Sequence, residues 1–195
     1  MEKKNELLKI DLGCGPNKKE GFKGMDILSL PGVDYVINLE EGFSFIKDNS
    51  VDEFYTSHFL EHIQNLEQVL SEIHRTLKPA GICTIIVPHF SNAYFYSDYT
   101  HKRFFGYYSF DYFSKPDKKI KRTVPVYNEK IGFEILSRKL IFRASRFPVI
   151  NLFKKHIIQR IFNSSYYFQE VYEGLFTNIF PCYELHFTLK KINNL

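Results

Sequence analysis

The fold is decided by residues 10–18, IDLGCGPNK, where a short apolar strand runs into two closely spaced glycines. This pattern is typical of an open α/β sheet, in which ligands bind beyond the carboxyl ends of the strands. Glycine at Gly13 and Gly15 lets the backbone approach a ligand closely. Asp11 lies at the end of this strand and Asp26 at the end of the next, where a carboxylate can accept both hydroxyls of a ribose.

Two other glycine loops do not fit this stretch. A nucleoside-triphosphate loop requires GxxxxGK[ST], which Lys18 and Lys19 do not supply. A dinucleotide-binding loop requires a third glycine in GxGxxG, and position 18 is lysine instead. Because ordinary turns also contain Gly-x-Gly, the interpretation depends on motifs further along the chain.

The rest of the chain alternates predicted strands with helices, as expected for an α/β sheet in one domain. Short apolar runs predict strands over residues 7–12, 22–27, 34–38, 51–57, 82–87, 132–142 and 183–192. Apolar residues three and four apart predict a helix from Ile63 to Leu77, which Pro79 and Gly81 end. An amphipathic helix is predicted over residues 149–163.

The composition is globular, with 195 residues, 44% apolar and 25% charged, and the length suits one domain. Aromatic residues make up 17% of the chain, which indicates a ring-rich pocket or an aromatic core. Residues 1–100 hold 9 Lys/Arg against 15 Asp/Glu, whereas residues 101–160 hold 15 against 4, a net charge of +11. This basic middle favours an anionic partner or forms a solvated face.

The cysteines and the apolar runs predict a cytoplasmic setting. Cys14, Cys83 and Cys182 lie far apart without metal-ligand spacing, so neither disulfides nor a metal site are expected. The first 30 residues begin with charges and hold no long apolar run, so no signal peptide is expected. No stretch of about 18 apolar residues is present that would span a membrane.

Further motifs come after the glycine loop in a set order: MD at residues 25–26, VDEFYTSHFLEHI at 51–63, LSEIHRTLKPAG at 70–81 and VPHF at 87–90. With DLGCGP they resemble the class I S-adenosylmethionine-dependent methyltransferases, above all their small-molecule, type 11 branch. The resemblance covers residues 7–90. It implies a Rossmann-like, mostly parallel sheet with an antiparallel last strand, S-adenosyl-L-methionine as cofactor, and methyl transfer as activity.

The resemblance also implies roles for the glycine loop. Gly13 and Gly15 would lie under the methionine and ribose parts of the cofactor, with Cys14 between them in the same loop. Asp11 would lie near the methionine amino group, and Asp26 would bind the ribose hydroxyls.

Two later strand ends match cofactor positions as well. Asn38 and Leu39 match a place that contacts adenine, with an amide here where the family often has a carboxylate. Ser57 and His58 match the strand end that faces the methyl group and the acceptor.

The chain departs from the family between its first two strands. Ten residues separate Gly15 from Asp26, too few for a full helix and a strand, so the first helix is expected to be shortened to a turn or loop. We expect one domain over residues 1–195. Its parts are a cofactor half (1–90), an aromatic insert after the fifth strand that covers the acceptor (91–131), and C-terminal strands with an inserted amphipathic helix (132–195).

Methyl transfer to a hydroxyl or amine requires alignment of the acceptor and removal of a proton, for which histidine is suited near neutral pH. The candidate catalytic residues are His58 and His89, which follow the fourth and fifth predicted strands, and His101 in the insert. For His62, at the predicted helix start, a structural hydrogen bond is expected.

The insert is expected to choose the acceptor. Its candidate substrate-binding residues are Tyr99, Lys102, Arg103 and Phe104, because rings and cations suit a polar ring that carries phosphate. The resemblance favours a small or lipid-linked acceptor, such as a cell-surface glycan intermediate.

Three alternatives stay open. The basic middle would also suit an RNA-binding protein or nucleic-acid methyltransferase, although residues 56–59, TSHF, lack the Asn/Asp-Pro-Pro-aromatic run of base-modifying enzymes. The helix over residues 149–163 would suit peripheral contact with the inner face of a membrane. The third alternative is a family member that binds the cofactor without catalysing methyl transfer, because such a protein would keep the same glycine loop. Nothing in the sequence indicates the oligomeric state.

Overall fold

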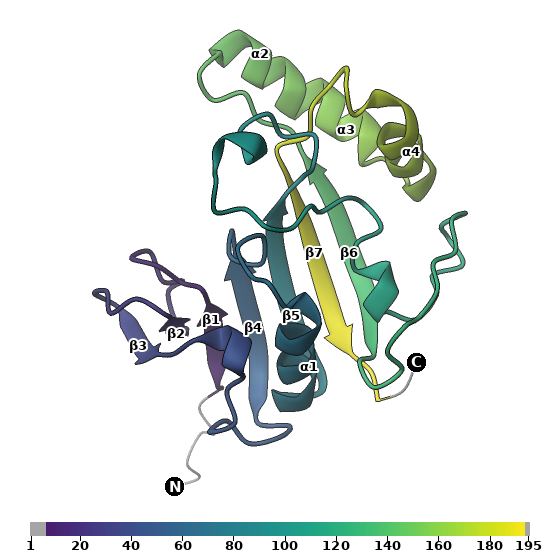
Figure 1. Cartoon of the computed structure of the whole chain (residues 1–195). Helices are drawn as coiled ribbons and strands as arrows, with labels where there is room; N and C mark the ends of the chain where they lie inside the picture. Colours follow the sequence, from purple (N-terminus) through teal and green to yellow (C-terminus); the bar gives the residue numbers. More distant parts are fainter. Residues whose placement is uncertain (1–6, 194–195) are drawn as a thin grey trace, which may run out of the picture.

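Seven strands pair in the order β3-β2-β1-β4-β5-β7-β6 in the computed structural model, which describes residues 7–193 (Figure 1). The strands are β1 (Lys9–Leu12), β2 (Lys23–Asp26), β3 (Val33–Val36), β4 (Val51–Ser57), β5 (Leu77–Pro88), β6 (Phe133–Ile141) and β7 (Glu184–Lys191). Strands β1 to β5 pair in parallel, and β7 runs antiparallel to both β5 and β6. The predicted sheet, mostly parallel with an antiparallel last strand, is confirmed.

Helix α1 (Leu66–Thr76) connects β4 to β5 and packs on one face of the sheet (Figure 1). It begins at Asn65, whose side-chain oxygen accepts a hydrogen bond from the backbone N–H of Gln68. Its buried stripe contains Val69, Leu70 and Ile73, the spacing that predicted it. The helix starts after residues 58–63, which form a turn instead of its first residues.

The connection from β1 to β2 holds no helix among the described residues, which confirms the shortened first helix. Residues 13–22 form turns, and the N–H groups of Gly13 and Cys14 both donate to the carbonyl of Met25, at 2.8 and 3.2 Å. The loop after β1 therefore folds directly back on β2. The connection from β3 to β4 carries a short 3₁₀ turn, η1 (Leu39–Glu41).

The aromatic insert connects β5 to β6 with two 3₁₀ turns, η2 (Phe95–Ser97) and η3 (Asp111–Phe113). Its rings are partly core: Phe105, Tyr107 and Phe110 are fully buried. Asp111 accepts two hydrogen bonds from the guanidinium of Arg138 on β6, at 2.8 and 2.9 Å. This buried ion pair ties the insert to the sheet, since either charge alone would be costly to bury.

Two helical segments lie between β6 and β7, beyond the carboxyl end of β6 (Figure 1). The first combines α2 (Pro148–Phe153), η4 (Lys154–Ile158) and α3 (Gln159–Phe162), as predicted, and the second combines α4 (Tyr166–Val171) with η5 (Tyr172–Phe176). The second was not predicted. Within the described part of the chain, no helix has the length and apolar character needed to cross a membrane.

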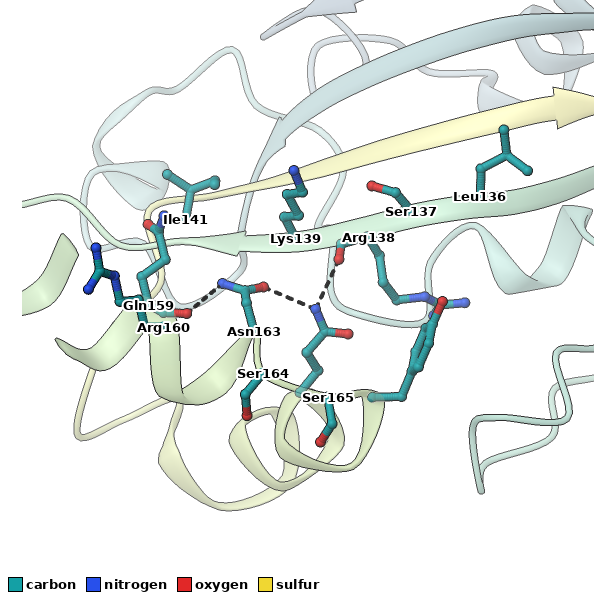
Figure 2. A pocket seen from close by; sticks show the side chains of 12 residues that line it. Leu136, Ser137, Arg138, Lys139, Ile141, Gln159, Arg160, Asn163, Ser164 and Ser165 are labelled. Atoms are coloured by element: carbon teal, nitrogen blue, oxygen red, sulfur yellow. Dashed lines mark hydrogen bonds between the residues drawn. The ribbon is translucent and has the colours of Figure 1, made fainter. Parts of the chain in front are cut away.

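The outer edge of β6 is covered by side-chain amides from these helices. Asn163 accepts from the N–H of Leu140 and donates to its carbonyl, at 2.9 and 2.7 Å, and Gln169 donates to the carbonyl of Arg138. Such bonds satisfy an edge that would otherwise pair with another chain. The hollow of about 740 Å³ beside this edge is lined by Asn163 and Gln169, whose amides bond to the backbone of β6, and the predicted site residues do not line it (Figure 2).

Candidate cofactor and acceptor site

A cavity of about 400 Å³ opens beyond the carboxyl ends of β1, β2 and β4. This size is typical of pockets for small molecules and cofactors. It is lined by six of the residues selected from the sequence, namely Gly13, Asp26, Asn38, Leu39, His58 and Lys102. The cavity therefore gathers residues from five separate connections at the sheet edge where ligands bind in open α/β folds.

Asp26 is held with its carboxylate at the cavity wall. Its Oδ2 accepts from the N–H of Gly15 and its Oδ1 from the N–H of Leu28, each at 2.9 Å. A carboxylate has about four acceptor positions, so each oxygen keeps one for a ligand hydroxyl. The orientation and the free acceptors fit a ribose at this position.

Only glycine fits at position 13, because of the backbone conformation there and the closeness of the Phe59 ring. Its φ of +64° lies in the left-handed region, and a Cβ there would come within 2.3 Å of the Phe59 ring. Phe59 comes from the turn after β4 and lines the same cavity. The glycine therefore allows the loop after β1 and the turn after β4 to meet.

Four predicted cofactor residues adjoin the cavity without lining it, namely Asp11, Cys14, Gly15 and Ser57. Asp11 is buried, which raises its pKa, and it accepts the N–H of Lys19 at 2.8 Å. Burial, with the nearby charges of Asp11 and Asp26, raises the pKa of the Cys14 thiol to about 11, so Cys14 stays protonated. Both side chains support the loop instead of presenting reactive groups.

Asn38 uses its amide locally. Its Oδ1 accepts from the N–H of Glu40 at 3.1 Å, and its Nδ2 donates to the carboxylate of Glu41 at 2.8 Å. The amide thereby caps the η1 turn at the cavity wall, while Leu39 is buried beside it. A contact with adenine would use the remaining acceptor position of the amide oxygen.

His58 lies between two buried carboxylates that the sequence did not single out. Its Nε2 is 3.0 Å from Glu184 Oε2, and its Nδ1 is 3.3 Å from Glu61 Oε1. Hydrogen bonding to Glu184 and Glu61 raises the pKa of His58 to about 9. Burial works to raise the pKa of Glu184, but the bonds from His186 and His58 outweigh it and lower it to about 2. His58 is thus a cation at neutral pH.

His89 is fully buried and does not line the cavity. Its Nδ1 bonds to Ser91, and its Nε2 lies 2.9 Å from Glu173 Oε2 on η5. The side chain thus fastens the second helical segment to the end of β5. Neither nitrogen is free to accept a proton from a substrate.

Backbone contacts of the insert hold His101 against His62, although His101 does not itself line the cavity. The N–H groups of Lys102 and Arg103 both donate to the carbonyl of Glu61, at 2.7 and 3.1 Å. His101 consequently packs against His62, with ring centroids 4.8 Å apart. The expectation of a helix start at His62 was wrong, because the residue lies in a turn and its side chain lines the cavity.

Three of the four predicted substrate-binding residues line one hollow, and Tyr99 does not. Tyr99 is 97% exposed, and Arg103 donates to the backbone carbonyls of Ile63 and Gln64. Lys102 lines the cofactor cavity and also a second hollow of about 500 Å³, which Arg103 and Phe104 share. Lys102 therefore marks the junction of the two spaces.

One of two sequence comparisons with known proteins found a match. Residues 26–85 match the family model described as a methyltransferase domain. A comparison with curated proteins found no match.

Solved structures share the fold at low sequence identity. An S-adenosylmethionine-dependent methyltransferase from Archaeoglobus fulgidus is 18% identical, with a TM-score of 0.60 over 96% of this chain and 87% of that one. One from Mesorhizobium loti is 14% identical, with a TM-score of 0.54 over 95% and 91%. An N-methyltransferase from Haemonchus contortus, in complex with phosphomonomethylethanolamine and S-adenosylhomocysteine, is 14% identical, with a TM-score of 0.51 over 95% and 48%.

We expect Gly13→Ala to destabilise the fold more than Gly21→Ala. Both residues have positive φ, so each alanine costs about 1–2 kcal/mol of backbone strain, but at Gly21 no atom lies within 4 Å of the new Cβ. At Gly13 the clash with Phe59 adds about 1–3 kcal/mol of overpacking. Urea unfolding of the two variants measures the difference, and equal losses would show that Phe59 does not rest on this glycine.

The family match over residues 26–85 and the shared fold together confirm the resemblance. The chain thus has the fold of S-adenosylmethionine-dependent methyltransferases, and its residues 26–85 match a methyltransferase domain.

Proposed function

We propose that this enzyme methylates a polar, lipid-linked acceptor, such as a glycan intermediate, at the surface of a membrane. The bound cofactor supplies a methyl group activated by a sulfonium. Asp26 would hold the ribose, and Gly13 with Phe59 would form the cavity wall beside it. These residues would bind and orient the cofactor, so the acceptor must enter from a neighbouring space.

The observation that carries this proposal is the junction at Lys102. The second hollow adjoins the cofactor cavity there and is lined by rings, among them Phe104, Tyr112 and Tyr127. Tyr112 and Tyr127 stack with their centroids 5.9 Å apart. Aromatic faces suit the apolar face of a sugar ring, and the Lys102 ammonium suits a phosphate group beside it.

The reacting group of the acceptor would lie against the histidine pair His62 and His101. His89 lies away from the cavity, and both nitrogens of His58 already face carboxylates. His62 lines the cavity, and His101 contacts it from the insert that also forms the second hollow. Of the three predicted histidines, the geometry therefore favours His101.

A surface of the first helical segment supports the lipid-linked character of the acceptor. Val149 is 80% exposed and Leu152 57% exposed, and further exposed apolar side chains extend this patch along the segment, namely Ile150, Phe153, Ile157 and Ile161. Residues 135–169 contain seven Lys/Arg and no Asp or Glu. An apolar patch bordered by cations matches an anionic bilayer surface.

We expect Asp26→Ala to lose binding of S-adenosylhomocysteine by more than about tenfold, because two hydroxyl acceptors at the cavity wall disappear. Calorimetric titration measures the affinity. Glu129→Ala, which removes an exposed carboxylate elsewhere, is the matched control and should bind as the wild type does. Normal binding by Asp26→Ala would refute the assignment of the cavity.

We expect the protein to co-sediment with vesicles of phosphatidylcholine and phosphatidylglycerol, and less with phosphatidylcholine alone. The double variant Val149→Glu/Leu152→Glu should reduce binding about tenfold or more, since it places charges in the apolar patch. Val36→Glu, at an exposed apolar residue of β3, is the control. Absence of vesicle binding, together with a dimer that the double variant dissolves, would instead assign the patch to a second copy of the chain.

A further inference from the structure

We propose that Glu61, His62 and His101 bind a divalent transition-metal ion beside the cofactor cavity. One potential ligand atom from each of the three residues lies within 4.8 Å of the other two. The set joins the turn after β4 to the insert, which the bonds from Lys102 and Arg103 to the Glu61 carbonyl hold together. Two imidazoles and one carboxylate form a donor set typical of metals such as Zn²⁺ and Co²⁺.

The hydrogen bonds of the two imidazoles leave a ligand nitrogen on each ring. His101 Nδ1 lies 2.9 Å from the carbonyl of Phe95, which can only accept, so Nδ1 donates there and Nε2, which lies 3.6 Å from Asp98 Oδ2, is the nitrogen left for a metal. His62 Nδ1 lies 2.8 Å from Thr100 Oγ1, whose own proton goes to Asp98 Oδ1 at 2.5 Å. Histidines that bind metals almost always donate their other N–H to such carbonyls and carboxylate networks.

Glu61 supplies the second, independent observation. Its side chain is completely buried, and its Oε2 has no hydrogen-bond or ion-pair partner among the described residues. His58 Nδ1, at 3.3 Å from Oε1, is a charged neighbour of Glu61, but His58 also serves Glu184. A buried carboxylate oxygen without a partner is costly, and a metal ion between Glu61 and the two imidazoles would supply a partner for Oε2.

The arrangement differs from the zinc site that the spacing of residues 58–62, HFLEH, would suggest. In that spacing two histidines on one helix face bind the metal. Here the residues form a turn, His58 has a φ of +54°, and its nitrogens face Glu184 and Glu61. The third ligand comes instead from His101, 39 positions beyond His62, which explains why no local spacing predicted the site.

The role of this metal rests on the proposed function. Three protein ligands leave an open position, and His62 lies on the wall of the cofactor cavity. A metal there would bind the acceptor oxygen and lower the pKa of its hydroxyl, whose proton passes to solvent. The oxygen–methyl bond then forms as the sulfur–methyl bond breaks, with the bonding electron pair returning to sulfur.

The test is titration of the untagged, chelator-treated full chain with Co²⁺ and, separately, with Zn²⁺. We expect one equivalent to bind, with visible Co²⁺ absorption bands. His101→Gln and Glu61→Gln should lower affinity at least about tenfold, and Thr100→Val about tenfold to a hundredfold, because Thr100 orients His62. His156→Gln, which alters an exposed histidine of η4, is the control and should match the wild type.

Absence of binding by the wild type, or equal binding by His101→Gln, would overturn the proposal. Because Glu61→Gln and His101→Gln alter largely buried groups, circular dichroism of each variant checks folding, and Thr100→Val provides an independent variant that leaves all three ligands in place. Binding of S-adenosylhomocysteine is measured on the same samples. Metal binding without cofactor binding would refute the proposed function alone, and cofactor binding without metal binding would refute the metal site alone.

Discussion

The turn after β4, residues 58–63, is the constraint on which the rest of the site depends. His58 adopts a left-handed φ of +54°, which costs a non-glycine residue about 1–2 kcal/mol. Ion pairs from its ring to Glu61 and Glu184 offset that cost. The same turn places Phe59 over Gly13, and its Glu61 carbonyl receives the N–H groups of the insert. One short segment therefore joins the glycine loop, β7 and the insert.

This connection explains why the cofactor cavity and the second hollow share a wall. The insert lacks long helices and relies on buried rings and on the Asp111–Arg138 ion pair for its position on the sheet. Its attachment to the turn brings His101 to His62 and Lys102 to the cavity. Because the first helix is missing, turns connect β1 to β2 beside the cavity. The Asp26 carboxylate accepts a hydrogen bond from the N–H of Gly15 within this connection.

Much of the fold is dictated by local patterns. The seven strands, α1 and the helix near residues 149–163 have apolar periodicities that a single sequence displays, and ten residues between Gly15 and Asp26 exclude a full helix. The second helical segment escaped prediction because residues 166–176, YYFQEVYEGLF, spread rings around the axis, so no single apolar stripe appears.

Most of the candidate cofactor cavity could be predicted, but its acceptor side could not. Asp26, Gly13 and Asn38 lie at strand ends whose order the motifs indicate. Glu184 is 126 positions from His58, and Glu173 is 84 positions from His89, so only the fold shows that these acids engage the histidines. Long-range pairing of this kind leaves no trace in local spacing.

Hydrogen exchange measured with and without S-adenosylhomocysteine tests the central claim, that the cofactor lies between the glycine loop and the turn after β4. We predict that the ligand slows amide exchange in residues 13–15, 37–40 and 58–63 and leaves residues 136–141, beside the hollow along β6, unchanged. Protection confined to residues 136–141, or absent from residues 58–63, would contradict the account.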